Sequence, residues 1–155
     1  MIRLLSRVVR TDEEVMAEHA ISLKDKAECL LDEELGDYCL DHLKVLRWVV
    51  CRMGQFTNAI DNHLWDEISI HAARIPSVDG GEINGAVREA EILISPFILE
   101  DIFQSLAVLC HELAHVAGSY DGTIGQLWNT EGLSMAMFKT ILTNMDDEIW
   151  EKIHV

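Results

Sequence analysis

The sequence has few basic residues for its length. It holds 12 Lys and Arg against 27 Asp and Glu, and its formal net charge is -15 at pH 7. A negative field of this size repels nucleic acids and anionic membrane surfaces, and it attracts cationic molecules. The composition therefore argues against a protein that binds nucleic acid or membranes, and it favours partners or substrates that are basic.

Long apolar runs and paired cysteines are also missing. No apolar stretch approaches the roughly 20 residues of a transmembrane helix. The opening MIRLLSRVVR interrupts its apolar pairs with Arg and Ser, unlike the continuous apolar core of a signal peptide. The four cysteines, Cys29, Cys39, Cys51 and Cys110, show no CxxC pairing and lie in apolar, helix-like stretches. Such thiols are typical of the reduced interior of a cytoplasmic protein, which is the location we expect.

A chain of 155 residues has the size of one domain. Hydrophobic residues make up 49% of the sequence and charged residues 25%, the profile of a compact globular protein rather than a disordered one. We expect a single, mostly helical α+β domain over residues 1–155. A helical scaffold would occupy about 1–66, and a small antiparallel sheet with the functional helices would occupy about 67–155. The oligomeric state stays open.

The first third of the sequence carries two helix patterns. A capping box at Thr11 and Glu14 predicts a helix from Asp12 to about Leu35. A second helix is predicted from Asp37 to about Met53, because apolar residues recur there at steps of four and three. That predicted core stripe consists of Cys39, Leu43, Leu46, Val50 and Met53.

The middle of the sequence changes from helical to extended patterns. Residues Glu67–Val78 alternate well enough to predict a strand, and the cluster DGGEING that follows predicts a turn. Residues Ala86–Ser95 predict a second strand. Two strands joined by such a turn indicate a small antiparallel sheet.

A long amphipathic helix is predicted from Ser95 to Gly118. Ser95 can cap its start, with Pro96 in the first turn, and Gly118 is a natural end. One apolar stripe runs along it and consists of Ile98, Ile102, Leu106, Leu109, Leu113 and Val116. At about 100° per residue, His111 and His115 lie off that stripe and side by side on another face.

The stretch HELAH on this helix has the pattern of a zinc site. Two imidazoles four residues apart can reach one ion, so we predict His111 and His115 as metal ligands. Glu112 lies about 100° round the helix from His111, where it can reach a water on the ion rather than the ion itself. Because zinc lowers the pKa of such a water towards ~7, a carboxylate beside it can act as general base and then acid. Glu112 is therefore the predicted catalytic residue.

From about Glu91 to about Met137 the sequence resembles the zincin metallopeptidases. The resemblance implies a zinc-dependent enzyme that hydrolyses peptide bonds, with a protein or peptide as its substrate. In that family a strand at the edge of the sheet precedes the HExxH helix and holds the extended substrate. The nearest candidate for this strand is EILIS, residues Glu91–Ser95.

Two branches of the zincins suggest different third ligands. The metzincin-like branch, including snapalysin-type proteases, continues its motif as HExxHxxGxxD, which is complete here with Gly118 and Asp121. A turn at Gly118 would bring the Asp121 carboxylate towards the metal. That branch also has a methionine turn beneath the metal, for which Met135 or Met137 could serve. Asp121 is the favoured third ligand.

The gluzincin branch takes its third ligand from a glutamate on a following helix. WNTEGLSMAMF offers Glu131 for that role, on a helix that would start near Ile124. Glu131 stays as the alternative third ligand.

A fainter resemblance to SprT-like metallopeptidases rests on Gly125 and Trp128 in DGTIGQLW, but the ligating histidine of that pattern is absent.

The sequence offers three weaker candidates for a catalytic role. A developing oxyanion could be stabilised by His63, His71 or Tyr120.

Two functions other than peptide hydrolysis are also open. The alternative function is a zinc-stabilised interaction module without catalysis, and the third is a helical binding protein in which HELAH is accidental. The intact Glu112 favours the enzyme, because a purely structural zinc site has no use for a proton carrier.

Overall fold

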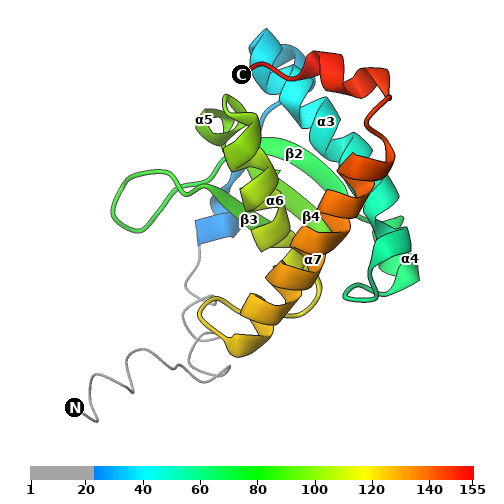
Figure 1. The fold of residues 1–155 in the computed structure, drawn as a ribbon. Helices are drawn as coiled ribbons and strands as arrows, with labels where there is room; N and C mark the ends of the chain where they lie inside the picture. The colour runs from blue at the N-terminus through cyan, green and yellow to red at the C-terminus, as the bar shows by residue number, and fades with distance from the viewer. Residues whose placement is uncertain (1–22) are drawn as a thin grey trace, which may run out of the picture.

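The computed structural model describes residues 23–155. Within them, helices pack with a four-stranded mixed sheet in a mixed α/β fold (Figure 1). In chain order the strands and α-helices are β1 (Glu28–Cys29), α3 (Asp37–Met53), α4 (Asn62–Trp65), β2 (Ser69–Arg74), β3 (Gly85–Arg88), β4 (Glu91–Ile94), α5 (Pro96–Leu99), α6 (Ile102–Val116) and α7 (Ile124–Thr143). The predicted capping box at Thr11 and Glu14, and the part of the predicted first helix up to residue 22, lie outside the described residues.

The sheet differs from the predicted antiparallel arrangement. Its strand order is β1-β2-β4-β3, with β4 parallel to β2 and antiparallel to β3. Ile92, Leu93 and Ile94 of β4 are all fully buried. A continuous apolar run of this kind is typical of a central strand covered on both faces. The segment 86–95 therefore forms most of β3 and all of β4, an inner strand of the sheet, and not one strand antiparallel to β2.

A sharp reversal inside the segment 86–95 explains why it forms two strands. The chain turns at Glu89, which adopts a left-handed φ of 56°. Arg88 and Glu91 face each other across this turn and form an ion pair of 2.8 Å. With the turn between β2 and β3, this second reversal makes β4 run parallel to β2.

The helix predicted over residues 37–53 is confirmed. α3 spans Asp37–Met53, and all five residues of its predicted stripe are buried. The prediction that the preceding helix reaches about Leu35 is wrong for residues 23–35, which form short 3-10 turns and β1. Tertiary contacts override helix propensity there. Arg47 of α3 links this segment to β2, because it donates hydrogen bonds both to the carboxylate of Asp32, at 2.8 Å, and to the carbonyl of Ile70, at 3.0 Å.

The predicted helix 95–118 is divided in two. α5 ends at Leu99, and α6 begins at Ile102 after Asp101, whose carboxylate caps the new helix. Asp101 rather than Ser95 is thus the N-cap of the long helix. The end of α6 at Val116, just before Gly118, agrees with the predicted stop.

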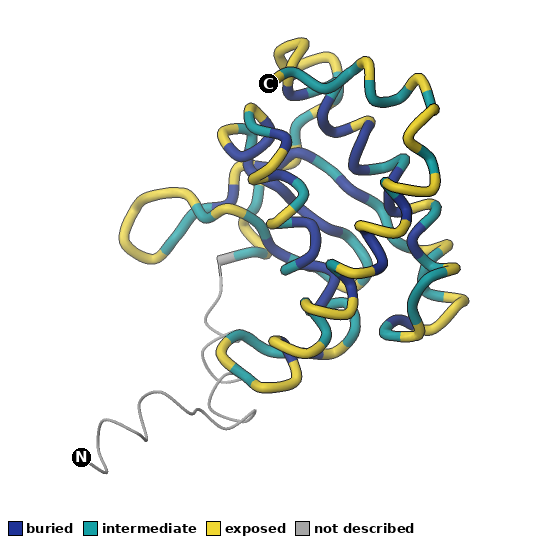
Figure 2. Tube along the Cα trace, viewed as in Figure 1, coloured by how far each residue is buried: buried dark blue, intermediate teal, exposed yellow. Residues whose placement is uncertain are grey.

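The core lies between the sheet and the helices. α3, α5 and α6 contact the strands, and α7 packs against α3 and α6. In Figure 2 the buried stretches run through β2, β4 and the inner sides of α3 and α6, whereas the loop between β2 and β3 is exposed. Over residues 23–155, no helix combines the length and the apolar character needed to cross a bilayer.

Candidate metal centre

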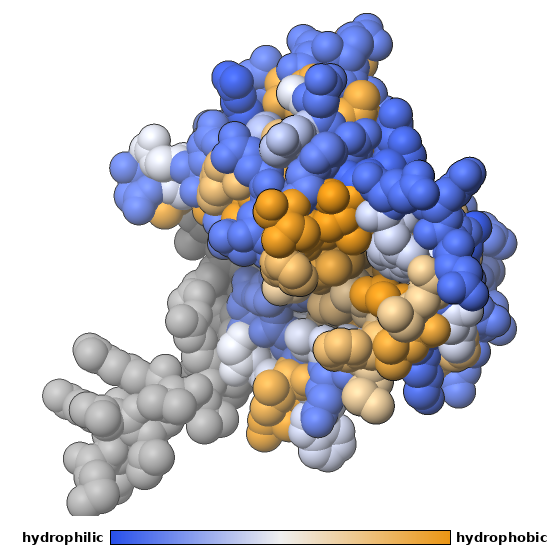
Figure 3. All heavy atoms as spheres, turned by 45° about the horizontal axis from the view of Figure 1, so that its top comes forward, coloured by the Kyte–Doolittle hydropathy of each residue, from blue (hydrophilic) through white to orange (hydrophobic). Residues whose placement is uncertain are grey.

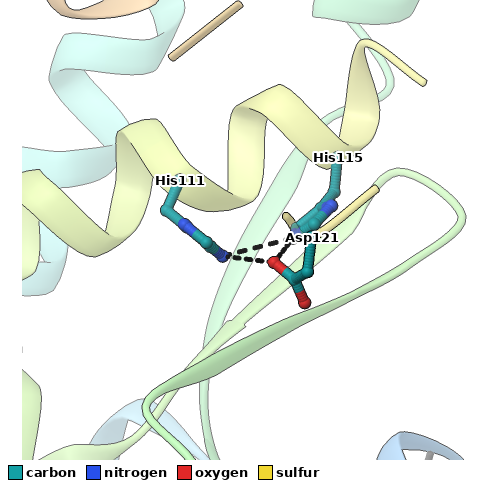
Figure 4. A group of neighbouring side chains, drawn as sticks. All are labelled: His111, His115 and Asp121. Atoms are coloured by element: carbon teal, nitrogen blue, oxygen red, sulfur yellow. Dashed lines mark hydrogen bonds and ion pairs between the residues drawn. The ribbon is translucent and has the colours of Figure 1, made fainter. Parts of the chain in front are cut away.

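Helix α6 carries His111 and His115 one turn apart on the same face (Figure 4). The helix is fixed at its start by Asp101, which accepts hydrogen bonds from the N–H groups of Phe103 at 2.8 Å and Gln104 at 3.2 Å. Its apolar side is buried in the core, so the two histidines face a surface pocket instead. Their Nε2 atoms lie 3.2 Å apart.

A tight turn after α6 brings Asp121 back to both histidines. Gly118 takes a left-handed φ of 96°, which glycine adopts without strain. Oδ1 of Asp121 then lies 3.0 Å from Nε2 of His111 and 3.0 Å from Nε2 of His115 (Figure 4). The three donor atoms, two from the helix and one from the loop, therefore lie close enough together to bind one ion.

The spacing of these donor atoms fits a zinc ion. Tetrahedral zinc holds histidine nitrogens at roughly 2.0–2.1 Å, which places neighbouring ligand atoms about 3.3 Å apart. The three edges of the triangle measure 3.2, 3.0 and 3.0 Å. Two imidazoles and one carboxylate also form a donor set that zinc accepts, with a further position left for water or substrate.

The ring of His115 is held in a tautomer suited to binding a metal. Its Nδ1 lies 2.7 Å from the backbone carbonyl of Ser119. Because a carbonyl only accepts, Nδ1 carries a hydrogen, so Nε2 is the ring nitrogen that faces Asp121 and that would bind an ion once it has lost its own proton. The side chain of His115 is 12% exposed and that of His111 is 45% exposed, so His115 is the more firmly packed of the two.

Gln126, a buried residue in the first turn of α7, fixes the loop that carries Asp121. Its Oε1 accepts a hydrogen bond from the N–H of Gly122 at 3.1 Å, which orients the amide. Its Nε2 donates to Oδ1 of Asp121 at 3.1 Å and lies 3.2 Å from the ring nitrogens of His111. Sequence reasoning missed Gln126, although Thr123 and Gln126 form a T-x-x-Q helix start that would have marked it.

Replacing Gln126 with Leu should weaken zinc binding without unfolding the protein. The variant keeps the volume of the side chain but loses the hydrogen bonds to Asp121 and Gly122. Loss of such an outer partner typically lowers metal affinity about 10- to 100-fold. Competition titration with a zinc chelator measures the change, and Gln104→Leu on the exposed start of α6 is the matched control. Equal zinc affinity for the Gln126 variant and the wild type would contradict the positioning role.

Glu112 lies in the wall of the same pocket. Its side chain is nearly buried, with 4% of the residue exposed, and this burial raises the pKa of its carboxyl group to about 7. The pocket has a volume of about 450 Å³ and is lined by Lys24, Ile83, Gly85, Ala86, Val87, Glu89, His111, Glu112, His115, Ser119, Tyr120 and Asp121. A carboxyl group that titrates near neutral pH can both accept a proton and return it.

Gly85 of β3 leaves the space that Glu112 occupies. A Cβ at Gly85 would lie 2.9 Å from Cγ1 of Val108, 3.0 Å from the carbonyl oxygen of Leu93 and 3.1 Å from Oε1 of Glu112. The first separation is shorter than real carbon contacts, and the other two are tight enough that the neighbouring atoms would have to shift. The absence of a side chain at Gly85 therefore sets how closely β3 approaches the buried carboxylate.

Gly85→Ala should destabilise the fold and displace Glu112. Overpacking of this kind costs about 1–3 kcal/mol of unfolding free energy. Gly132→Ala is the matched control, because a Cβ there meets nothing within 4 Å and alanine favours the helix by about 0.5–1 kcal/mol. Thermal unfolding compares the two. A Gly85 variant as stable as the wild type would show that the neighbouring residues move aside at no cost in free energy.

The charges of the site shift its pKa values in opposite directions. Two hydrogen bonds hold the pKa of Asp121 far below its usual range: the one from His111 has the larger effect, and the one from His115 adds to it. The hydrogen bond to Asp121 in turn raises the pKa of His111. Burial lowers the pKa of His115, but its hydrogen bonds to Asp121 and Ser119 outweigh this, and the net shift is upwards. Without metal, His111, His115 and Glu112 therefore keep their protons to a higher pH than the free side chains would.

The stability of the metal-free protein should therefore fall as pH rises. The raised pKa of Glu112 removes stability from about pH 4.5 to about 7. The stabilisation from the two histidines is complete below about pH 6.5 and is lost as pH passes their raised pKa values. Zinc displaces those protons, so the rise in Tm that it causes should grow with pH. Thermal unfolding with zinc and with chelator, from pH 5.5 to 8, tests this. A zinc-induced shift that shrinks with pH would contradict it.

The other predicted site residues lie elsewhere, apart from Tyr120. Glu131 is exposed on α7 and is not part of the His111, His115 and Asp121 group. His63 on α4 and His71 on β2 are not among the residues that line the pocket, whereas Tyr120 is.

The predicted methionine turn is wrong. Met135 and Met137 both lie within α7 and not in a turn. Met135 is exposed, and Met137 is buried with its sulfur 3.7 Å from Sγ of Cys110, the residue before His111.

Comparisons with known proteins add no family to this picture. No protein-family model, characterised protein or solved structure matches the chain at a significant level. The case for a function therefore comes from the geometry and chemistry of the pocket.

Proposed function

We propose that this protein is a zincin-like, zinc-dependent metallopeptidase in which His111, His115 and Asp121 hold the ion and Glu112 moves protons. The observation that carries the proposal is the meeting of three donor atoms, 3.0–3.2 Å apart, beside a buried glutamate with a pKa of about 7. Three protein ligands and a proton carrier are typical of catalytic zinc sites, whereas structural sites close with four protein ligands.

The residues of the pocket suit the hydrolysis of an amide bond. Zinc bound here would polarise the carbonyl group of the substrate and acidify a water molecule. The carboxylate of Glu112 accepts a proton from water as the water oxygen bonds to the carbonyl carbon. It then returns that proton to the amide nitrogen as the carbon–nitrogen bond breaks. Tyr120 lines the same pocket, and its hydroxyl group is the candidate donor to the developing oxyanion.

The edge of the sheet supports a peptide as substrate. β4, which contains the EILIS segment, is paired on both sides, so the predicted edge strand is wrong in its position. Among the described residues, β3 lies at one edge of the sheet instead, and its residues Gly85, Ala86 and Val87 line the pocket. An extended peptide can bind such an edge through main-chain hydrogen bonds. The net charge of -15 favours basic peptides or proteins as substrates of an enzyme that we expect to be cytoplasmic.

Metal analysis combined with a cleavage assay tests the proposal. We expect one zinc per purified chain and hydrolysis of some members of a mixed peptide library. Treatment with a chelator should abolish hydrolysis, and added zinc should restore it. Zinc without cleavage would favour the non-catalytic interaction module. A protein that binds no zinc at micromolar concentration would refute both functions.

A further inference from the structure

Helix α7 presents apolar side chains on two opposite sides. Its inner side is buried against α3 and α6 through Leu133, Ala136 and Met137. A second set of large apolar residues points to solvent, and we name it the outer stripe: Ile124, Trp128, Met135, Phe138, Leu142 and, just beyond the helix end, Met145. Trp128 is 71% exposed and Phe138 63% exposed. A helix that is apolar on both sides is normally covered on both.

The outer stripe has the spacing of a helix-packing seam. Its positions follow one another at steps of four and three along the chain, with Glu131 as the single charged residue in the row. At about 100° per residue these positions lie opposite the buried side of α7. Figure 3 shows hydrophobic surface over α6 and α7. Contiguous apolar surface of this kind is characteristic of a binding site.

The first ten residues of the chain have the chemistry to cover this stripe. When the sequence MIRLLSRVVR is projected at about 100° per residue, its apolar residues fall on one side and its three arginines on the other. These ten residues hold three of the 12 basic residues of the chain and none of its 27 acidic ones. The remainder of the protein is strongly acidic, and therefore attracts a cationic segment.

The chain is long enough for this segment to reach α7. Lys24 lines the same pocket as Asp121, which lies three residues before the start of α7. Residues 11–22 can span up to roughly 40 Å when extended, whereas a 20-residue helix is about 30 Å long. The whole length of the outer stripe is therefore within reach.

We propose that the outer stripe of α7 is the docking surface for residues 1–10 of the same chain. The apolar side of the segment lies on the stripe, and its arginines remain in solvent near the acidic surface. A second copy of the protein fits this surface less well. Two chains of charge -15 repel each other, and a seam between two α7 helices would cover Glu131 with a second acidic chain, whereas residues 1–10 bring three arginines to the edge of the stripe.

Photo-cross-linking from the stripe tests the proposal. Phe138→p-benzoylphenylalanine should form an intrachain cross-link to residues 1–10, identified by mass spectrometry of the monomer after cleavage at acidic residues. The same substitution at Thr143, exposed on α7 about 100° away from the stripe, is the matched control and should give no such product. Replacing Arg3, Arg7 and Arg10 with Glu should abolish the cross-link.

Two outcomes would overturn the proposal. Cross-linked dimers would assign the stripe to a second copy of the chain. A monomer in which Phe138→p-benzoylphenylalanine leaves residues 1–10 unmodified would show that the segment does not dock there. The zinc content of each variant, measured in parallel, shows that its metal centre is intact, so the result does not depend on the proposed peptidase activity.

Discussion

Replacing Glu112 with Gln should slow peptide hydrolysis severely while leaving zinc bound. The amide has almost the same shape as the carboxylate, but it cannot accept the proton of a water molecule. General acid–base catalysis by a positioned side chain typically contributes about 100- to 10,000-fold, and kcat/KM should fall by that factor. Since the buried carboxyl group has a pKa raised by its own desolvation, the variant should also be at least as stable as the wild type near pH 8.

The same exchange elsewhere on the protein controls for an indirect effect. Glu131→Gln changes an exposed glutamate outside the pocket and should leave both zinc content and hydrolysis unchanged. Metal analysis and steady-state kinetics on one cleavable peptide compare the two variants with the wild type. Undiminished hydrolysis by the Glu112 variant would show that another group, or no group, carries the proton.

Helices with a clear local pattern were predictable from the sequence. α3 begins and ends where its apolar spacing and flanking glycines indicate, because a long amphipathic repeat is decided by residues close in the chain. α6 ends as Gly118 predicts, but its start was misplaced. Both Ser95 and Asp101 are good N-cap residues, and the sequence does not show which of them the backbone uses.

The arrangement of the strands was not predictable in the same way. Patterns show where an extended segment lies but not which strand becomes its neighbour. The turn at Glu89 lacks the glycine that usually signals a two-residue hairpin, so residues 86–95 were interpreted as one strand. β1 depends on pairing with β2, more than 40 residues away, and its own sequence favours a helix.

The candidate site was predictable where its residues are close in the chain. His111, Glu112 and His115 share one helix, and a single glycine turn links them to Asp121. Gly85 contributes through a contact between β3 and α6, which depends on the unpredicted sheet order. Contacts of this kind become visible only once the chain is folded.

Asp121→Ala should remove most of the zinc from the protein, and Glu131→Ala should not. Asp121 supplies one of the three donor atoms of the group, and its loss leaves two imidazoles without the negative charge that balances the ion. The loss in affinity should exceed the roughly 10- to 100-fold expected for an outer partner such as Gln126. His111→Ala, which removes another donor, should have a comparable effect and serves as the reference.

Zinc per chain, measured after dialysis against a weak chelator, separates the two carboxylates. Full occupancy in Asp121→Ala together with loss in Glu131→Ala would place the third ligand on α7. Such a result would require the start of α7 to rotate or shift, because Glu131 is exposed and Gln126 holds Asp121 at the histidines. A double variant, Gln126→Leu with Glu131→Ala, tests for that rearrangement. If Asp121 is the ligand, the zinc affinity of the double variant should match that of Gln126→Leu alone, since the two substitutions then act independently.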